Sequence, residues 1–193
     1  MLIGQYFKNL HPKFKNHFFS DLIFNSKICK KNSIFFAIRG TNQNGNKFIN
    51  DALKKGARTI VSDQKFQGFK KKVLYLRYQN VRKILAETAY KVFSKKPKNL
   101  TAVTGTNGKS SIANFYYQIL KLNKKKVASI GTLGVKSKKI NLNLSNTTID
   151  PKKLGEILKK LKKERIDNVI MEASSHGLKQ NRLDGLKFNS GIF

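Results

Sequence analysis

A short glycine-containing segment, Gly105-Thr106-Asn107-Gly108-Lys109-Ser110, carries the residue types that bind phosphate groups. Glycines allow backbone N–H groups to turn towards an anion. The ammonium of Lys109 would neutralise the β- and γ-phosphates of a nucleotide, and the hydroxyl of Ser110 would ligate Mg²⁺. The segment therefore predicts a site for ATP and Mg²⁺, with Lys109 as a catalytic residue and Ser110 as a metal ligand.

The sequence around this segment predicts a strand over residues 100–104 and a helix over residues 109–122. A glycine loop between a strand and a helix binds phosphate with the positive end of the helix dipole. The match to the pattern G-x-x-x-x-G-K-[ST] is incomplete, because Val103 stands at its first position. The alternative, a glycine turn followed by Lys and Ser by chance, is disfavoured by the flanking strand and helix. We assign nucleotide binding to Gly105, Thr106, Asn107, Gly108, Lys109, Ser110 and Ser111.

A second group of polar residues follows a predicted strand over residues 168–171. Glu172 stands at the end of this strand, where a carboxylate could hold Mg²⁺ and act as a catalytic residue. Arg182 has a planar guanidinium that can pair with a carboxylate in fork geometry. Taken singly, each residue has an ordinary alternative: Arg182 as a surface charge, the pair Thr147-Thr148 as a helix cap, and His176 as a turn residue instead of a metal or substrate contact.

Composition indicates a folded, strongly basic protein. The chain has 193 residues, 39% of them hydrophobic, and a net charge of +30. Clustered Lys and Arg could bind nucleic acid, but these lysines are scattered over the whole chain. Abundant Lys, Asn and Ile also follow from an AT-rich coding sequence. We therefore expect a basic surface that attracts a phosphate-bearing substrate, and no nucleic acid as the main partner.

Cysteine content and hydropathy restrict the setting. A single cysteine, Cys29, excludes an internal disulfide and a cysteine-cluster metal site, and we expect it to be a buried small hydrophobic residue. No apolar run approaches the roughly 20 residues of a membrane span. The N-terminus, interrupted by lysines, does not resemble a signal peptide. These features predict a cytoplasmic protein without a membrane partner, which we expect to be a monomer.

Alternating strand and helix patterns predict an α/β fold. Strands are expected at residues 33–38, 59–61, 73–76, 100–104, 126–130 and 168–171, and helices at residues 47–55, 81–93, 109–122 and 151–165. Gly56 would cap the first helix, because glycine adopts the left-handed conformation at low cost. The polar, proline-containing residues 94–98 mark the best boundary. We therefore expect an N-terminal domain over residues 1–97 and a nucleotide-binding, parallel-sheet domain over residues 98–193.

The loop Thr104-Gly105-Thr106-Asn107-Gly108-Lys109-Ser110 resembles that of the Mur ligase superfamily. Within this superfamily, residues 171–182 resemble the M-E-[VA]-S-S-H-G-L-x-Q-x-R stretch of the branch that adds the third amino acid to the peptidoglycan stem peptide. Residues 146–151 resemble its N-T-T-P-D-P segment, with Ile149 in place of proline. Residues 24–27 and 33–40 are similar to its uridine-binding domain, with Asn25 and Lys27 in place of Asp and Arg.

The resemblance implies an ATP-dependent ligase of peptidoglycan synthesis. Such an enzyme phosphorylates the carboxylate of UDP-N-acetylmuramoyl-L-alanyl-D-glutamate and lets the amine of diaminopimelate or lysine displace the phosphate. It also implies contacts of Phe24, Ser26, Thr41, Asn42 and Gln43 with the uridine diphosphate. The muramoyl dipeptide would contact Asn146, Thr147, Thr148, Ser174, Gln180 and Arg182. ATP and Mg²⁺ would be the cofactors, with Ser110 and Glu172 at the metal.

The sequence ends at Phe193 in what looks like a core strand. In the family, the parts that follow carry a histidine, a lysine that becomes carbamylated, and a C-terminal domain. We therefore expect a fragment that lacks ligase activity by itself. Three alternatives stay open: a folylpolyglutamate synthetase-like ligase, a basic nucleic-acid-binding phosphate-loop protein, and a non-catalytic remnant that still binds nucleotide.

Overall fold

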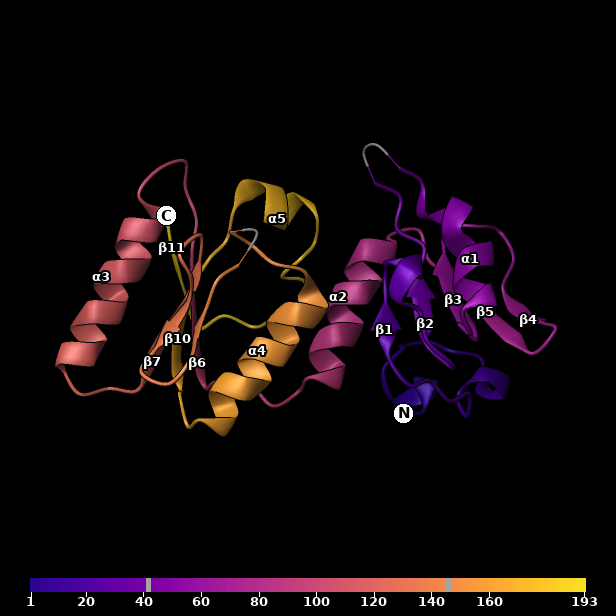
Figure 1. Ribbon diagram of the computed structural model, residues 1–193, viewed down its shortest axis with the longest axis horizontal. Helices are drawn as coiled ribbons and strands as arrows, with labels where there is room; N and C mark the ends of the chain where they lie inside the picture. The colour runs from indigo at the N-terminus through magenta and orange to yellow at the C-terminus, as the bar shows by residue number, and fades with distance from the viewer. Residues whose placement is uncertain (41–42, 145–146) are drawn as a thin grey trace. The chain divides into compact units, whose positions relative to one another are not determined.

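The chain folds into two compact units, Met1–Thr88 and Ala89–Phe193. The computed structural model describes residues 1–40, 43–144 and 147–193. The helix α2 (Val81–Val92) runs across the division between the units. Each unit contains its own sheet, so the predicted α/β class is confirmed (Figure 1).

The first unit is built on a five-stranded sheet in the order β1-β2-β3-β5-β4. Its strands are β1 (Leu22–Ile23), β2 (Ile34–Phe36), β3 (Thr59–Ser62), β4 (Gly68–Lys70) and β5 (Val73–Arg77). All neighbours are parallel except β4 and β5. Short 3-10 turns lie at Ile3–Gln5, Pro12–Phe14, Ser26–Ile28 and Gly45–Phe48.

The short helix α1 (Ile49–Lys54) covers one face of this sheet. Ile49 and Ala52 pack there with Phe35 and Ile60, and the whole cluster is buried. Cys29 belongs to the same cluster, as expected, and burial raises the pKa of its thiol. Gly56 follows the helix with φ +99°, which confirms its predicted role as the terminating residue.

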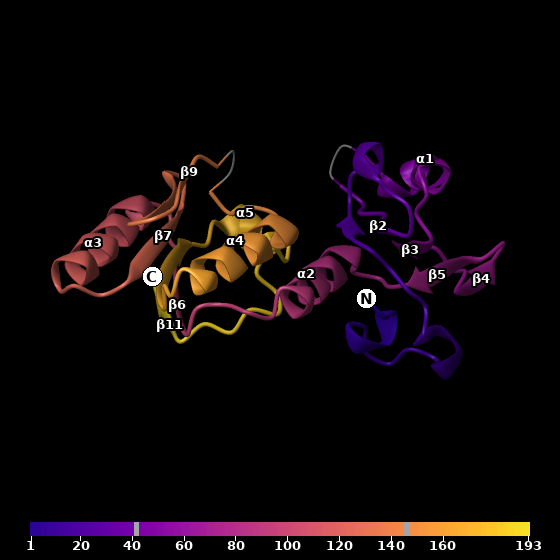
Figure 2. The ribbon, with the colours of Figure 1, turned by 60° about the horizontal axis from the view of Figure 1, so that its bottom comes forward.

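The second unit is built on a six-stranded sheet in the order β11-β6-β10-β7-β8-β9. The parallel strands are β11 (Ser190–Ile192), β6 (Asn99–Val103), β10 (Asn168–Glu172) and β7 (Val127–Gly131). The antiparallel strands β8 (Gly134–Ser137) and β9 (Asn141–Leu142) extend the sheet beyond β7. Figure 2 shows β9 on the outside of this extension.

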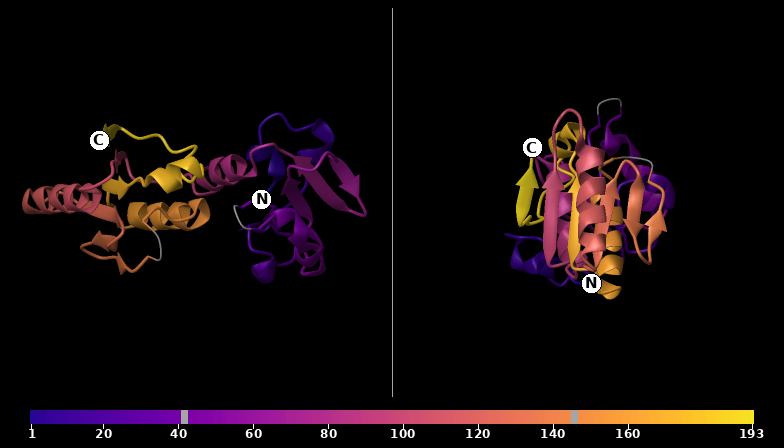
Figure 3. Two further views of the ribbon diagram at one scale, coloured as in Figure 1. Left: turned by 90° about the horizontal axis from the view of Figure 1, so that it is seen from above. Right: turned by 90° about the vertical axis from the view of Figure 1, so that its left-hand side faces the viewer.

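Helices cover both faces of the second sheet, with α3 (Lys109–Leu122) on one face and α4 (Pro151–Lys163) on the other (Figure 3). On the α3 face, Ala113 packs with Val103 and Ile170. On α4, the buried residues Leu154, Leu158 and Leu161 recur at helical spacing. A fifth helix, α5 (Ser175–Lys179), follows β10 directly. Burial on both faces agrees with the apolar, fully buried residues Val169, Ile170 and Met171 of β10.

Most predicted elements are present, and the differences have local causes. The helix expected from residue 47 begins as a 3-10 turn, because the side chain of Asn44 accepts a hydrogen bond from the Asn46 N–H. The helix α4 ends at Lys163 instead of residue 165, because Arg165 adopts φ +58°. The final strand was predicted to be a core strand. Among the described residues, β11 lies at the sheet edge and its first two residues are exposed.

No helix in the described part of the chain is both long and apolar enough to span a membrane.

The start of α4 offers a test of local stability. The side chain of Asp150 accepts a hydrogen bond from the Lys153 N–H at 2.9 Å, and Pro151 occupies the first helical position. Asp150→Ala removes this cap and should lower the free energy of unfolding by about 1 kcal/mol. Asp150→Asn keeps an oxygen acceptor and should stay within a few tenths of a kcal/mol of the parent. Urea unfolding followed by circular dichroism measures both; equal losses would contradict the capping role.

Candidate functional site

The carboxyl ends of β6, β10 and β7 meet at one edge of the second sheet. Parallel pairing places Glu172 beside Val103, and Met171 beside Ile130. The glycine loop begins directly after β6, and Gly131 ends β7. Ligands of open α/β sheets bind beyond this edge, where loops and helix N-termini converge.

The glycine loop turns into α3 through two glycines with positive φ. Gly105 has φ +132° and Gly108 has φ +79°. Gly108 is the N-cap of α3, and no side chain caps the helix there. The first N–H groups of α3 therefore point out of the helix without a side-chain partner at the cap, which suits an anion.

The ammonium of Lys109 folds back over the loop. Its Nζ donates to the carbonyl oxygens of Gly105 at 2.7 Å and Thr106 at 3.0 Å. These bonds hold the positive charge close to the loop backbone, next to the N-terminus of α3. Thr106, Asn107 and Ser111 are exposed.

Glu172 is a buried carboxylate, with only 4% of the residue exposed. The Ser110 hydroxyl donates to Oε2 at 3.0 Å, and the Thr132 hydroxyl donates to the same oxygen at 3.0 Å. The Thr132 N–H donates to Oε1 at 3.1 Å. These three donors satisfy a carboxylate that would otherwise be costly to bury. They also join the phosphate loop to β10 and to the end of β7.

Gly131 and Thr132 contact Glu172 in the candidate site, and the sequence interpretation missed both. A Cβ at position 131 would lie 2.1 Å from Oε1 of Glu172, so only glycine leaves room for this carboxylate. Their place at the end of a strand next to β10 was the available indication, since parallel strand ends meet at one edge.

The hydroxyl of Thr148 joins the other side of β10 to α5. It donates to the Glu172 carbonyl at 3.1 Å and accepts from the Ser174 N–H at 2.9 Å. Its proton is therefore used, and the Ser174 hydroxyl must be the donor in their 3.1 Å contact. Ser174 also caps α5, because its Oγ accepts from the Gly177 N–H.

Beside Thr148, hydrogen bonds connect the side chains of Arg182, Gln180 and His176. The guanidinium of Arg182 donates to Oε1 of Gln180 through Nε at 3.0 Å and Nη2 at 2.7 Å, and to the Thr148 carbonyl through Nη1. The amide nitrogen of Gln180 thus faces Nε2 of His176 at 2.7 Å, which makes that ring nitrogen an acceptor. In this arrangement the ring proton is on Nδ1 of His176.

Tyr90 stabilises the backbone at Arg182. Its hydroxyl donates to the Arg182 carbonyl at 2.6 Å. Burial, with added repulsion from Asp150 and Asp184, raises the pKa of the Tyr90 phenol far above its usual range. The phenol therefore stays a neutral donor.

The structure brings the predicted residues of the second unit together in one network. Ser110 and Glu172 are in contact, Thr147 contacts Thr132 at 2.9 Å, and Thr148, Ser174, Gln180 and Arg182 are linked by hydrogen bonds. The predicted residue Asn146 lies outside the described residues.

The predicted uridine-contact residues lie in the first unit. Phe24 is 40% exposed and Gln43 is exposed. Ser26 is buried, and its hydroxyl hydrogen bond lowers the pKa of Asp51. The replaced residue Asn25 caps the turn that follows, by accepting from the Lys27 N–H at 3.0 Å. Two further predicted residues, Thr41 and Asn42, lie outside the described residues.

In the described part of the chain, no three His, Cys, Asp or Glu side chains cluster as a metal site. A cation at this edge would therefore be held by a hydroxyl, one carboxylate and its substrate, as Mg²⁺ commonly is.

Comparisons with known proteins agree with the predicted resemblance to Mur ligases. Residues 103–193 match the family described as the Mur ligase middle domain. The chain is 43% identical over 185 residues to the UDP-N-acetylmuramoyl-L-alanyl-D-glutamate–2,6-diaminopimelate ligase of Rickettsia prowazekii, covering 94% of this chain and 38% of the relative. It is 39% identical over 168 residues to the ligase of the same name from Bradyrhizobium diazoefficiens, covering 87% of this chain and 34% of the relative.

A solved structure of a UDP-N-acetylmuramoyl-L-alanyl-D-glutamate–2,6-diaminopimelate ligase is similar to 95% of this chain, with a TM-score of 0.79 and 25% identity. The chain covers 37% of that structure. The sequence thus spans only about 38% of the length of the curated relatives that it matches.

The close packing of Gly131 against Glu172 can be tested by measuring the free energy of unfolding of two variants. Gly131→Ala places a methyl group against the carboxylate and should lower the free energy of unfolding by about 2 kcal/mol or more, through overpacking and lost hydrogen bonds. Gly191→Ala is the matched control, because a Cβ there meets nothing within 4 Å. Urea unfolding of both variants gives the comparison. A Gly131→Ala protein as stable as Gly191→Ala would contradict the packing described here.

Proposed function

Because residues 103–193 match the family described as the Mur ligase middle domain, we propose that this chain is the nucleotide-sugar- and ATP-binding part of an ATP-dependent amide-forming ligase. The substrate would be UDP-N-acetylmuramoyl-L-alanyl-D-glutamate, and the amine would come from 2,6-diaminopimelate, since the names of its relatives include both compounds. The observation that carries the proposal is the contact of Ser110 with Glu172 at the carboxyl edge of the sheet.

The proposed chemistry is carboxylate activation. A carboxylate is a poor electrophile, so a carboxylate oxygen attacks the γ-phosphorus of ATP and ADP leaves. The amine then attacks the resulting acyl phosphate, the C–O bond to phosphate breaks, and inorganic phosphate leaves as the amide forms. Phosphoryl transfer of this kind depends on positioning and on charge stabilisation.

The glycine loop would supply both positioning and charge stabilisation for ATP. Its backbone N–H groups and the N-terminus of α3 would receive the phosphates, and Lys109 would exchange its two carbonyl partners for phosphate oxygens.

Ser110 and Glu172 would supply a hydroxyl and a carboxylate oxygen to Mg²⁺. This ion is usually held by one or two protein oxygens together with substrate phosphates. Oγ of Ser110 and Oε2 of Glu172 are 3.0 Å apart. The ion would neutralise charge on the phosphates, while Thr132 keeps Glu172 oriented through the N–H and the hydroxyl.

Arg182 is suited to the acidic dipeptide of the proposed substrate. Three of its five N–H groups are used, on Gln180 and the Thr148 carbonyl. One N–H on Nη1 and one on Nη2 are left to bond a carboxylate. Thr147, Ser174 and Gln180 line the same network and would bond peptide or sugar groups, as would Asn146.

The first unit would hold the uridine diphosphate, through Phe24, Ser26, Gln43, Thr41 and Asn42. We propose the domains as residues 1–97 for this role and 98–193 for ATP, and a monomer that acts in the cytoplasm. The exposed ring of Phe24 is available for stacking on a base, whereas Ser26 would first have to release Asp51.

The phosphate loop gives a direct prediction. Lys109→Ala should weaken ATP binding by about ten- to a hundredfold, since a charge-assisted hydrogen bond to phosphate is lost. Lys187→Ala, an exposed lysine outside the network, is the charge-matched control and should leave the affinity unchanged. Isothermal titration calorimetry with ATP and Mg²⁺ measures both. Equal affinities of the two variants would argue against nucleotide binding at this loop.

The proposed substrate gives a second prediction. The 193-residue chain should bind UDP-N-acetylmuramoyl-L-alanyl-D-glutamate, and Arg182→Lys should weaken this binding, because Lys lacks the planar fork. UDP alone should bind the parent and Arg182→Lys equally, because the dipeptide is missing from it. If the dipeptide substrate binds no better than UDP to the parent, the substrate assignment is wrong.

A further inference from the structure

A basic hollow lies at the opposite, amino edge of the second sheet, and the proposed ligase chemistry does not use it. It has a volume of about 860 Å³. Three segments surround it: the end of α3 with residues 121–127, the end of β8 with residues 137–139, and the end of α4 with residues 163–166. The strand β7 separates it from Gly131 by about 13 Å, at 3.3 Å per residue.

The local backbone conformation and strand pairing bring these three segments together around the hollow. After α3, Lys124 adopts φ +56°, and after α4, Arg165 adopts φ +58°, so that both chains turn sharply into β7 and β10. Strand β8 runs antiparallel to β7, which returns Ser137 to the side of Ala128, near the start of β7. The hollow is therefore a consequence of the fold.

The charge around the hollow is strongly one-sided. Eight cationic side chains and one carboxylate, that of Glu164, belong to its lining: Lys121, Lys124, Lys125, Lys126, Lys138, Lys139, Lys163, Arg165 and Glu164. Glu164 is paired with Lys139 at 2.8 Å, a contact that lowers the pKa of its carboxyl group. Seven cations thus surround the hollow in addition to this pair.

Helix dipoles account for only a small part of this charge. The C-termini of α3 and α4 each carry about half a negative elementary charge, and Lys121 and Lys163 in their last turns complement it. Of the remaining cations, Lys124, Lys125 and Arg165 directly follow the helix ends, whereas Lys126 precedes β7 and Lys138 and Lys139 follow β8. Mutual repulsion of these cations is relieved by an anion bound among them.

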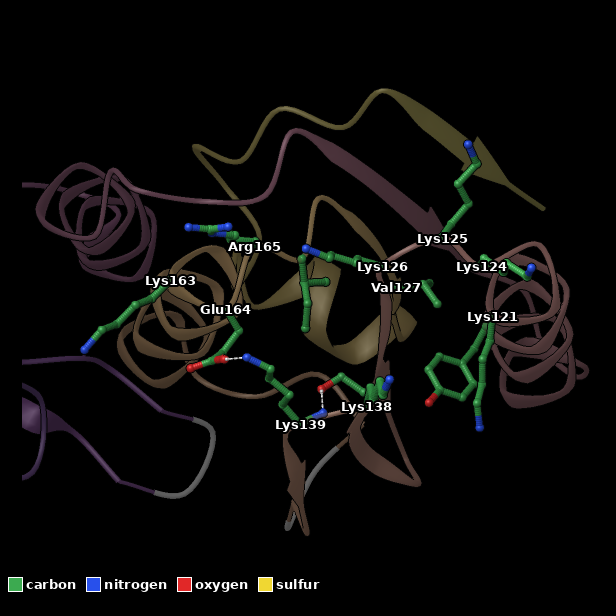
Figure 4. A pocket seen from close by; sticks show the side chains of 13 residues that line it. Lys121, Lys124, Lys125, Lys126, Val127, Lys138, Lys139, Lys163, Glu164 and Arg165 are labelled. Carbon is green, nitrogen blue, oxygen red and sulfur yellow. Dashed lines mark hydrogen bonds and ion pairs between the residues drawn. The ribbon is translucent and has the colours of Figure 1, made fainter.

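The side chains differ in direction (Figure 4). Lys126, Lys138, Lys139 and Arg165 lie around the centre, whereas Lys125 and Lys163 extend away from the other labelled residues. The lining also includes the buried residues Val127 and Ile166 and the half-buried ring of Tyr117. Lys121 lies over that ring at 5.8 Å from its centroid.

We propose that this hollow binds a small anion with a chain of phosphate groups, such as inorganic tripolyphosphate or the phosphates of a nucleotide, at a site separate from the glycine loop. Several exposed ammonium groups on flexible stems suit a compact ligand with many charges, because each acts as a point charge with rotatable donors. The volume lies within the range of small-molecule sites, about 300–1,000 Å³.

The same features favour a small anion over nucleic acid. Single-stranded nucleic acid is bound along a groove with several aromatic rings for successive bases. Among the residues that line this hollow, Tyr117 is the one aromatic ring, and Lys121 already covers it.

The test separates this site from the glycine loop by using Lys109→Ala as the background. In that variant, without Mg²⁺, calorimetric titration with tripolyphosphate should show saturable binding of one equivalent. Adding Lys126→Ala and Lys138→Ala should weaken it about tenfold, since each exposed ion contact contributes a few-fold. The dependence of log affinity on log salt should also become shallower by about one to two, because fewer counterions are released.

The matched control adds Lys179→Ala and Lys187→Ala to the same background, two exposed lysines outside the hollow. This pair should change the affinity less than twofold.

No saturable binding, or an equal loss in both pairs, would overturn the proposal. So would tighter binding of a single-stranded ten-nucleotide oligomer than of tripolyphosphate, if that binding is lost in the Lys126 and Lys138 variant. Nucleotide binding at the glycine loop is measured separately in the Lys109 parent, so the two proposals fail independently.

Discussion

The burial of one carboxylate constrains the whole carboxyl edge of the second unit. Glu172 is 4% exposed, and a carboxylate removed from water needs donors from its surroundings. Those donors come from two different segments: Ser110 at the start of α3 and Thr132 after β7. The parallel register of β6, β10 and β7 brings both segments to the end of β10, so the sheet and the position of the glycine loop depend on each other.

The same residue connects two groups of ligand-binding candidates. The carboxylate of Glu172 contacts the phosphate-loop side, and its backbone carbonyl accepts from Thr148 on the side of α5 and Arg182. A methyl group at Gly177 would lie 2.5 Å from Cβ of Thr148, just as one at Gly131 would collide with the carboxylate. Close packing therefore requires glycine at two places, one on the proposed nucleotide side of β10 and one on the proposed substrate side. This arrangement suits a reaction in which a carboxylate must meet the γ-phosphate of ATP.

The sequence predicted what depends on local pattern. Helix α3 has the predicted bounds, Glu172 lies at a strand end as expected, and the similarity to Mur ligases agrees with the match of residues 103–193. It did not predict what depends on pairing between distant segments. Thr132 contacts Glu172 across 40 residues; its position after a predicted strand indicates the shared edge of the sheet, but not this contact. The strands β8 and β9 were missed because lysines and asparagines interrupt their pattern, and their stability comes from pairing with β7.

A double-mutant cycle on ATP affinity tests most directly whether Ser110 and Glu172 act together on one Mg²⁺. Ser110→Ala, Glu172→Gln and the double variant are titrated with ATP in the presence of Mg²⁺ and again with a chelator. Each single variant should lose most of the Mg²⁺-dependent part of the affinity, and the double variant should lose little more, since both residues act through the same ion. Affinity without Mg²⁺ should change far less. Additive losses in the double variant, or equal losses with and without Mg²⁺, would show that Ser110 and Glu172 do not act through one ion.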